Sequence, residues 1–341
     1  MSGARTVVRR AEGLCLALLT AAGGLVLSGC ATPGSTAADR SHAAATAGPH
    51  HRAGRPAPPA TGTGPAATPT TATTTTTTTT TTVPPQAGWT VLATEPTGVA
   101  VDSRTLTEAD GTTVRVLRFR SGQVRFDLHV GTSDPPTGSV VLPPSASPQI
   151  GPTESSSILA AFNAGFKVTA HAGGVEVDGH VLTPLENGMA SLVIDASGRA
   201  SIGVWGTAGF AAVAGQAVSV RQNLPPLVVA GAPSPAASTW PSWGATLGGG
   251  PYVARSALGE DAAGDLIYAA SMSTLPVDLA DALVSSGAVI GMELDINPEW
   301  VQADVAPTPG AALVAAVPGQ NRPADQYMVG WTRDFIAVLA R

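Results

Sequence analysis

The chain has little cysteine and almost no lysine. Two of its 341 residues are cysteine, Cys15 and Cys30, and both precede residue 31. The rest of the chain can therefore hold no disulfide, no cysteine-ligated zinc and no thiol nucleophile. Lys167 is the single lysine, and the net charge is -6 at pH 7. Because binding to nucleic acid requires a basic face, these features exclude a nucleic-acid partner.

Charged and aromatic residues are also scarce, whereas glycine and proline are abundant. Charged residues make up 12% of the chain and aromatic residues 4%, beside 39 glycines and 29 prolines. This composition excludes a chain that is globular throughout. The excess of small and turn-forming residues lies near the N-terminus, where we expect a non-globular segment.

Residues 1–29 have the pattern of a secretory signal. Arginines precede an apolar stretch over 14–27, which is too short to span a membrane comfortably. The Leu-Ser-Gly-Cys sequence that ends at Cys30 resembles the bacterial lipobox. This resemblance implies cleavage before Cys30 and lipidation of that cysteine, which would anchor the exported protein to the outer face of the cell membrane. The alternative is an ordinary cleavage site beside an incidental cysteine.

Residues 30–86 are expected to form a disordered tether. They include ten consecutive threonines at 73–82, and residues 31–86 contain no Leu, Ile, Phe or Trp. Such a segment cannot bury enough apolar surface to offset the entropy of an ordered chain. We therefore expect it to connect the membrane to one globular domain over residues 87–341.

The pattern of this domain predicts the α+β class, with a mixed, mostly antiparallel sheet and a few helices. Alternating apolar residues predict strands over 113–119 and 124–130, joined as a hairpin. A second hairpin is predicted over 174–182, with its turn at Asp178-Gly179. Further strands are predicted over 190–194, 201–205, 218–230, 252–258, 265–271, 288–295, 327–332 and 335–340. Helices are predicted over 154–162 and 275–286, the second with Thr274 as its N-cap.

Two places in the domain carry polar groups suited to binding. Asn163 follows the first predicted helix and could donate and accept hydrogen bonds in a pocket, although a helix C-cap is the alternative. Arg255 follows a glycine-rich loop that includes Gly249 and Gly250. An arginine beside exposed backbone N–H groups suits a phosphate or carboxylate, and an ordinary surface arginine is the alternative.

A third place lies at the end of the strand predicted over 288–295. Glu293, Asp295 and Glu299 lie within seven residues, so two of them could act as acid and base or could bind a hard cation. The spacing does not fit a calcium loop, because Trp300 stands where that loop needs glycine. No motif indicates a cofactor, and a divalent cation stays open. The alternative is a solvated junction between strand and loop.

These places, taken in order, resemble the phosphodiester glycosidase family, to which N-acetylglucosamine-1-phosphodiester alpha-N-acetylglucosaminidase belongs. Ala-Phe-Asn-Ala-Gly-Phe at 161–166 is similar to the family's Asn-Gly-Gly-Phe-Phe stretch, and Arg-Ser-Ala-Leu-Gly at 255–259 to its Arg-Thr-Ala-hydrophobic-Gly strand. Residues 274–280 resemble its Thr-x-x-Glu-Leu-Ala helix, and Met-Glu-Leu-Asp at 292–295 its Ala-x-Asn-Leu-Asp strand. The order and spacing agree over about 150–340.

The sequence departs from the family directly after Asp295. The family continues with Gly-Gly-Gly-Ser, whereas this chain has Ile-Asn-Pro-Glu-Trp at 296–300, and proline and tryptophan cannot take the conformations of glycine. The family's Asp-Gly-Arg is also replaced, by Ala-Ser-Met at 270–272. Asn163, Arg255 and Asp295 match family positions, whereas the residues of the family's glycine loop have no counterpart.

Two functions follow from this resemblance. In the first, the domain hydrolyses sugar-1-phosphodiesters of envelope glycans, with Asp295 or Glu299 as acid or base, Asn163 orienting the sugar, and Arg255 with the amides of the Gly249–Gly250 loop holding the phosphodiester. In the second, the altered loop has abolished chemistry and the protein is a glycan-binding lipoprotein of the cell envelope. Its platforms for sugar rings would then be Trp240, Trp243 and Trp300.

Overall fold

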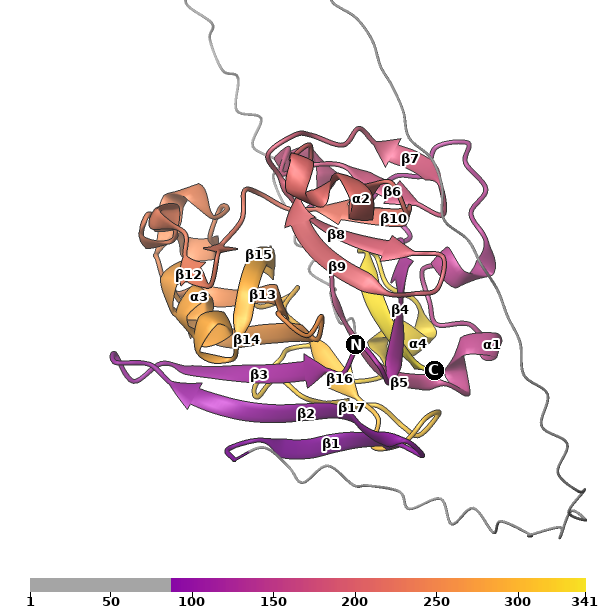
Figure 1. The fold of residues 1–341 in the computed structure, drawn as a ribbon, viewed down its shortest axis with the longest axis horizontal. Helices are drawn as coiled ribbons and strands as arrows, with labels where there is room; N and C mark the ends of the chain where they lie inside the picture. Colours follow the sequence, from indigo (N-terminus) through magenta and orange to yellow (C-terminus); the bar gives the residue numbers. More distant parts are fainter. Residues whose placement is uncertain (1–86) are drawn as a thin grey trace, which may run out of the picture. The chain divides into compact units, whose positions relative to one another are not determined.

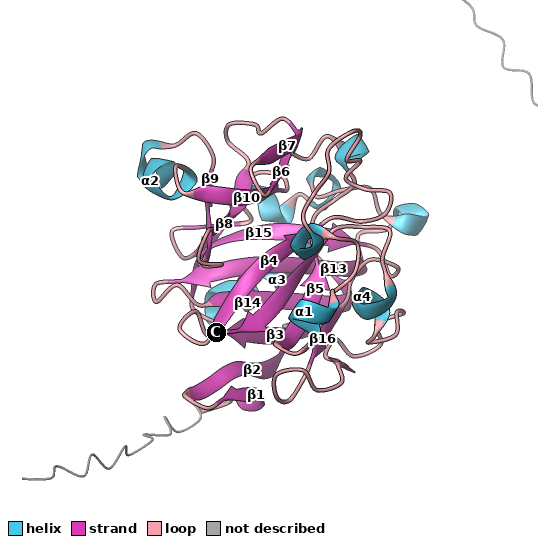
Figure 2. Cartoon of the chain, turned by 90° about the vertical axis from the view of Figure 1, so that its right-hand side faces the viewer, coloured by secondary structure: helices cyan, strands magenta, loops and turns pink. Residues whose placement is uncertain are grey.

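The structure, a computed structural model, describes residues 87–341. All strand pairings within this range are antiparallel, and the helices are short segments among them (Figure 2). The predicted α+β class with a mostly antiparallel sheet is thus confirmed. The signal sequence, Cys30 and the tether lie outside the described residues.

An eight-stranded sheet is the largest unit, with order β1-β2-β3-β14-β13-β15-β11-β12. Its strands are β1 (Thr90–Glu95), β2 (Gly98–Thr107), β3 (Thr113–Phe119), β14 (Leu266–Thr274), β13 (Val253–Asp261), β15 (Ala288–Ile296), β11 (Val228–Val229) and β12 (Ala232–Pro233). The predicted strands over 252–258, 265–271 and 288–295 are confirmed here. The β13–β14 and β13–β15 pairings bring the start of β13 to the ends of both neighbours.

Two five-stranded sheets complete the fold. The first has the order β17-β16-β5-β18-β4 and the second β7-β6-β10-β8-β9. The strands of the first are β17 (Val314–Ala315), β16 (Ala303–Val305), β5 (Ile158–Asn163), β18 (Phe335–Ala340) and β4 (Val124–His129). Those of the second are β7 (His180–Thr183), β6 (Val175–Val177), β10 (Ala217–Gln222), β8 (Ala190–Asp195) and β9 (Ala200–Val204).

The three sheets share one apolar core. Leu117 and Leu258 of the large sheet, Phe162 and Ile336 of the first small sheet, and Leu192 of the second belong to one cluster of buried side chains. A second cluster joins the other face of the large sheet to α3 (Pro276–Ser285), which Figure 1 shows beside β13 and β14. The large sheet is therefore covered on both faces.

The remaining α-helices are single turns: α1 (Pro152–Ser155), α2 (Ala211–Ala214) and α4 (Gln326–Val329). In the described part of the chain, no helix has the length and apolar character that crossing a membrane requires. The helix predicted over 275–286 is confirmed as α3. Its N-cap is Leu275 rather than Thr274, because Asp278 accepts a hydrogen bond from the Leu275 N–H at 3.0 Å.

Several other predictions about elements are wrong. Residues 218–230 are not one strand, because β10 ends at Gln222 and only Val228–Val229 form β11, in another sheet. Residues 154–162 are not a helix: α1 stops at Ser155 and β5 follows, because the run from Ile158 is buried on both faces. Residues 327–332 are not a strand but α4 and the loop after it. The strands over 113–119 and 124–130 exist as β3 and β4, but they do not form a hairpin, since they belong to different sheets.

Candidate functional site

The end of β15 delivers two buried carboxylates to a cluster of arginines. Glu293 is fully buried, and its Oε1 accepts a hydrogen bond of 2.7 Å from Arg255 Nη1 on β13. The same nitrogen donates to the carbonyl oxygen of Trp243 at 2.9 Å. Arg255 is itself 0% exposed, so its guanidinium is enclosed between β15 and the loop that precedes β13.

Asp295 lies two residues further and is held from three directions. Its Oδ2 lies 2.9 Å from Arg333 Nη2, and its Oδ1 accepts the Ile296 N–H at 2.9 Å. Its own backbone N–H donates to the Ala164 carbonyl at 2.9 Å. Asp295 keeps 6% of its surface exposed, whereas Glu293 keeps none. Of these two carboxylates, Asp295 is the one that solvent reaches.

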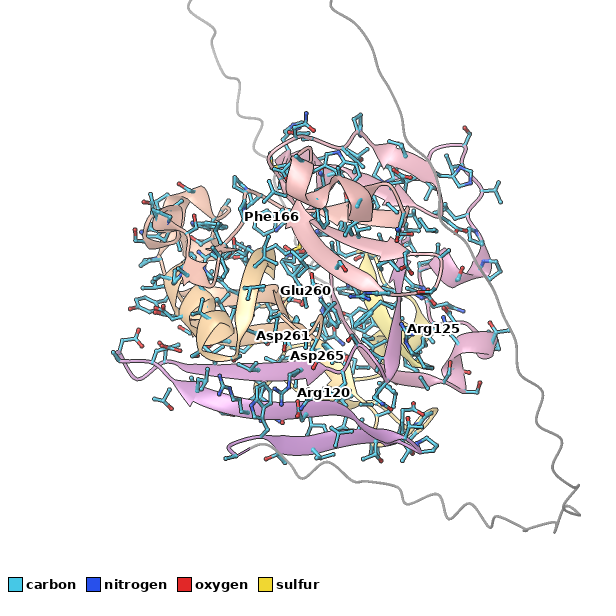
Figure 3. All side chains as sticks on the ribbon, in the orientation of Figure 1. Arg120, Arg125, Phe166, Glu260, Asp261 and Asp265 are labelled. Carbon is cyan, nitrogen blue, oxygen red and sulfur yellow. The ribbon has the colours of Figure 1, made fainter. Side chains whose placement is uncertain are left out.

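A third ion pair lies beside this one. Arg221, the fifth residue of β10, donates from Nε to Asp334 Oδ2 at 2.5 Å and from Nη2 to the Phe166 carbonyl. Phe166, labelled in Figure 3, packs against Ile296 of β15. A Cβ placed on Gly165 would lie 2.7 Å from Arg221 Cζ. Glycine at 165 is therefore required by the close approach of the guanidinium.

The cluster contains more acid than base. Arg221, Arg255 and Arg333 face Glu293, Asp295 and Asp334, and Arg333 Nε also lies 3.4 Å from Asp134 Oδ2. Three cations thus face four carboxyl groups. The negative charge that the arginines leave unbalanced favours protonation of one carboxyl group in the cluster.

The pKa values reflect burial first. Burial raises the pKa of Asp295 to about 7, although Arg333 and the hydrogen bond from the Ile296 N–H partly offset it. Burial also raises the pKa of Glu293 and of Asp334, against the opposing effects of Arg255 and Arg221 respectively. A carboxyl group that titrates near neutral pH suits proton transfer.

Asn163 uses its hydrogen-bonding groups inside the fold. Its Nδ2 donates to Ser256 Oγ at 2.9 Å and to the Ala164 carbonyl at 3.1 Å. Its Oδ1 accepts from the Tyr268 hydroxyl at 2.9 Å and from the Gln302 N–H at 3.2 Å. Ser256 Oγ in turn donates to the Asp295 carbonyl at 2.8 Å. Asn163 is thus connected to Asp295 through one hydroxyl group and positions the end of β15.

Trp300 lies at the exposed side of the cluster. The Arg333 guanidinium carbon is 5.0 Å from its ring centroid and Lys167 Nζ is 5.4 Å from it. Lys167 is exposed and Trp300 is half-buried. Two cations therefore meet at one indole, and one of them also holds Asp295.

The structure places Glu299 differently. Its side chain is exposed, and its carboxylate contacts Arg322 Nη2 at 2.5 Å and Asn321 Nδ2 at 3.2 Å. The hydrogen bonds and ion pairs of the described residues do not join it to Asp295. Asp295, Asn163 and Arg255 come together, whereas Glu299 lies in a separate surface pair.

The glycine-rich loop is anchored beside Asp295. Asn297 Oδ1 accepts the Leu247 N–H at 2.8 Å, and Asn297 Nδ2 donates to the Ala245 carbonyl at 3.2 Å. Gly248 and Gly249 have φ values of 80° and 70°, and Gly250 follows in an extended conformation. Asn297 itself has a φ of 76°, so it adopts a left-handed conformation of the kind that glycine takes readily.

Trp243 is not a platform for sugar rings. It is 2% exposed, belongs to the apolar cluster under α3, and donates its indole N–H to the Ala236 carbonyl at 2.8 Å. Trp240 is half-buried and Trp300 carries the cations described above. The prediction for Trp243 is therefore wrong.

Sequence reasoning missed Arg221, Arg333 and Asp334. One signal was present, because residues 87–341 contain only 12 Lys and Arg, and a charged residue inside an apolar strand must find a buried partner. Arg221, within Val-Ser-Val-Arg-Gln, meets that description. Arg333 and Asp334 precede β18 without such a pattern.

In residues 87–341, no group of three or more His, Asp or Glu side chains is arranged to hold a metal ion. No protein-family model and no curated protein matches the sequence.

Several solved structures are similar in their chain path. The catalytic domain of zebrafish N-acetylglucosamine-1-phosphodiester alpha-N-acetylglucosaminidase, auto-inhibited by pro-peptide, matches with a TM-score of 0.46 and 13% identity, over 74% of this chain and 88% of that one. A hypothetical protein from Synechocystis matches with a TM-score of 0.44 and 14% identity, over 72% and 63%. A Burkholderia pseudomallei protein described as exported matches with a TM-score of 0.29 and 12% identity, over 71% and 75%. At these scores and identities, none of them assigns an activity or a residue role to this chain.

Proposed function

We propose that this chain is an exported, lipid-anchored hydrolase of the cell envelope that cleaves sugar-1-phosphodiester linkages of envelope glycans. The observation that carries the proposal is Asp295, a carboxyl group at a strand end with a pKa of about 7 and 6% of its surface exposed. The family resemblance of the sequence around Asn163, Arg255 and Asp295 supports the same activity. Cys30 is the proposed site of lipidation.

The chemistry assigns Asp295 the role of base. In this reaction the bond between the anomeric carbon and the phosphate oxygen breaks, and the electron pair leaves with a phosphate monoester, whose second pKa is about 6. Such a group leaves without being protonated, so the demanding step is the attack of water. Ionised Asp295 accepts the proton of that water while the new carbon–oxygen bond forms.

The groups around Trp300 are proposed to bind the substrate through charge and stacking. Exposed Lys167 provides a cation for the phosphodiester, and the indole of Trp300 provides an apolar face for the sugar. Arg255, Asn163 and the Gly249–Gly250 loop are proposed to hold the end of β15 and Asp295 in position, without contacting the substrate. Glu299 remains proposed as a second carboxylate, and this role requires it to leave Arg322.

The test is hydrolysis of a panel of chromogenic sugar-1-phosphodiesters by the purified full-length protein. Each substrate is assayed with chelator and with added Mg²⁺ or Ca²⁺, because the need for a divalent cation is open. The phosphate monoester that is released keeps the chromophore, so a coupling phosphatase is added to free it. A signal that is lost in Asp295→Asn supports the proposal, provided the variant keeps the melting temperature of the wild type.

A second function is favoured by one specific observation. Asn163 and Arg255 are engaged inside the fold, with 3% and 0% of their surfaces exposed, so neither presents a free polar group to a substrate. A glycan-binding lipoprotein without catalysis would have this arrangement. Binding of envelope glycan without release of product from any substrate would favour this second function.

A further inference from the structure

A separate cavity lies where β2, β3 and β14 meet the loop after β17. Its volume is about 430 Å³, which is within the range of pockets that hold small ligands, roughly 300–1,000 Å³. The residues that line it include Thr105, Asp110, Thr113, Arg115 and Ser273. Asp295 and its arginines are not among them, and neither the sequence motifs nor the proposed function uses this cavity.

Arg115 is a cation without a counterion. It is half-buried, and none of the carboxylates in residues 87–341 forms an ion pair with it. Its Nη1 donates to Thr105 Oγ1 at 3.3 Å, while its buried Nε has no hydrogen-bond partner in the described part of the chain. Burial lowers the pKa of Arg115, but a guanidinium stays charged at any physiological pH. A charge that has lost part of its hydration in this way favours an anion.

Hydroxyl groups line the same cavity as this guanidinium. Thr105 keeps its own hydroxyl proton to donate, because it accepts from Arg115. The hydroxyls of Thr113 and Ser273 are exposed and make no hydrogen bond with other residues of the described range. Donors from three strands can therefore reach one tetrahedral oxyanion from several sides, as phosphate requires.

The lining of the cavity also offers an acceptor. The Asp110 carboxylate accepts hydrogen bonds from the Thr112 N–H at 2.8 Å and from the Tyr252 hydroxyl at 3.0 Å. Each carboxylate oxygen has a second lone pair that can accept from a hydroxyl group of a ligand. One part of the cavity thus suits an anion and the other suits alcohol groups.

We propose that this cavity binds a small phosphorylated polyol, with its phosphate on Arg115 and the hydroxyls of Thr105, Thr113 and Ser273, and its alcohol groups toward Asp110. Arg115 pairs with Ala270, and Ala270 pairs with Ser256, across neighbouring strands. The backbone of Arg115 therefore lies about 10 Å across the sheet from that of Ser256, whose hydroxyl contacts the Asp295 carbonyl, since neighbouring strands are about 4.8 Å apart. The proposal does not depend on the proposed hydrolysis, because binding is tested without turnover.

The experiment is isothermal titration calorimetry of the full-length protein with glycerol 3-phosphate, inorganic phosphate and glycerol. The variants are Arg115→Gln, Arg115→Lys and the double variant Thr113→Ala/Ser273→Ala. The matched control is Arg104→Gln, which removes a half-buried arginine of the neighbouring strand that does not line the cavity. Melting temperatures identify any variant that fails to fold.

We expect the wild type to bind glycerol 3-phosphate more tightly than phosphate and to bind glycerol far more weakly than either. Arg115→Gln should weaken binding of both phosphates at least tenfold, Arg115→Lys about threefold or more, and Arg104→Gln less than twofold. The exposed double variant, which leaves the core untouched, should weaken binding about threefold.

Absence of phosphate binding by the wild type would overturn the proposal. Equal weakening by Arg104→Gln, or unchanged binding in the double variant and a folded Arg115→Gln, would also overturn it.

Discussion

At the scale of single residues, three buried arginines determine what surrounds Asp295. Arg221, Arg255 and Arg333 are each at most 4% exposed, and each contacts a carboxylate. A buried pair contributes little net stability, but removing one partner leaves an uncompensated charge. These contacts therefore fix the geometry of the end of β15 more than they stabilise the molecule.

Gly165 gives a test of that geometry. Gly165→Ala places a methyl group against the Arg221 guanidinium, which has to leave Asp334 or the Phe166 carbonyl. We expect a loss of about 1–3 kcal/mol in the free energy of unfolding, together with loss of activity. Chemical denaturation measures the first and the sugar phosphodiester assay the second.

The matched control is Gly209→Ala. A Cβ at Gly209 meets nothing within 4 Å, so the stability of this variant should stay within about 0.5 kcal/mol of the wild type. Equal stability of both variants would contradict the close packing at Gly165.

Some residues of the cluster around Asp295 could be predicted from the sequence, and others could not, for a physical reason. Asp295 and Arg255 could be found because each stands at the boundary of an apolar strand and a loop. Arg333 contacts Asp295 from the segment before β18, and Arg221 of β10 contacts Asp334 beside it. Both segments are separated from β15 by long stretches of chain. Contacts of this kind depend on how sheets pack and leave no local pattern.

At the scale of elements, β5 shows why the sequence predicts a helix where the structure has a strand. The run Ile-Leu-Ala-Ala-Phe contains alanine and leucine, which favour helices, directly after a helix-like turn at α1. All six residues of β5 are buried between β16 and β18. Burial on both faces removes the alternation that would identify a strand, so tertiary context overrides local propensity.

The N-terminus of α3 allows a direct measurement at this scale. Asp278 accepts hydrogen bonds from the Leu275 N–H at 3.0 Å and from Thr274 Oγ1 at 3.1 Å. Asp278→Ala removes both, and we expect it to cost about 1 kcal/mol of stability. Asp281→Ala is the control, because Asp281 is exposed on the same helix. Thermal or chemical denaturation should show a loss for the first variant alone, and equal losses would refute the role of the cap.

At the scale of the whole molecule, three sheets enclose one core that includes several carboxyl groups. Burial raises the pKa of Asp304 to about 7, although Gln302 and Gln320 each donate a hydrogen bond of 2.7 Å to it. Among the described residues it forms no ion pair with a cation. Asp295 has a pKa of about 7 as well. The folded protein therefore holds protons that the unfolded chain releases near pH 4.

Stability should consequently fall as the pH rises. Asp295 and Asp304 contribute fully to the free energy of unfolding below about pH 4, and this contribution is lost as the pH passes through about 7. Each unit of difference in pKa between the folded and unfolded states corresponds to about 1.4 kcal/mol. We expect a lower melting temperature at pH 8 than at pH 5.5. Asp304→Asn, which cannot ionise, should show a smaller fall. A melting temperature that rises over this range, or an identical fall in the variant, would contradict the assignment.

The central claim is that Asp295 is the base of a sugar phosphodiester hydrolase, and a pH–rate profile tests it most directly. The initial rate of phosphomonoester release should be measured from pH 5.5 to 8.5 for the wild type and for Asp295→Asn. A base with a pKa of about 7 predicts that kcat/KM of the wild type rises through that pH and then levels. The variant should lose at least a hundredfold and show no rise. A profile of the same shape and height in Asp295→Asn, or no release at any pH from a folded protein that binds the glycan, would contradict the claim.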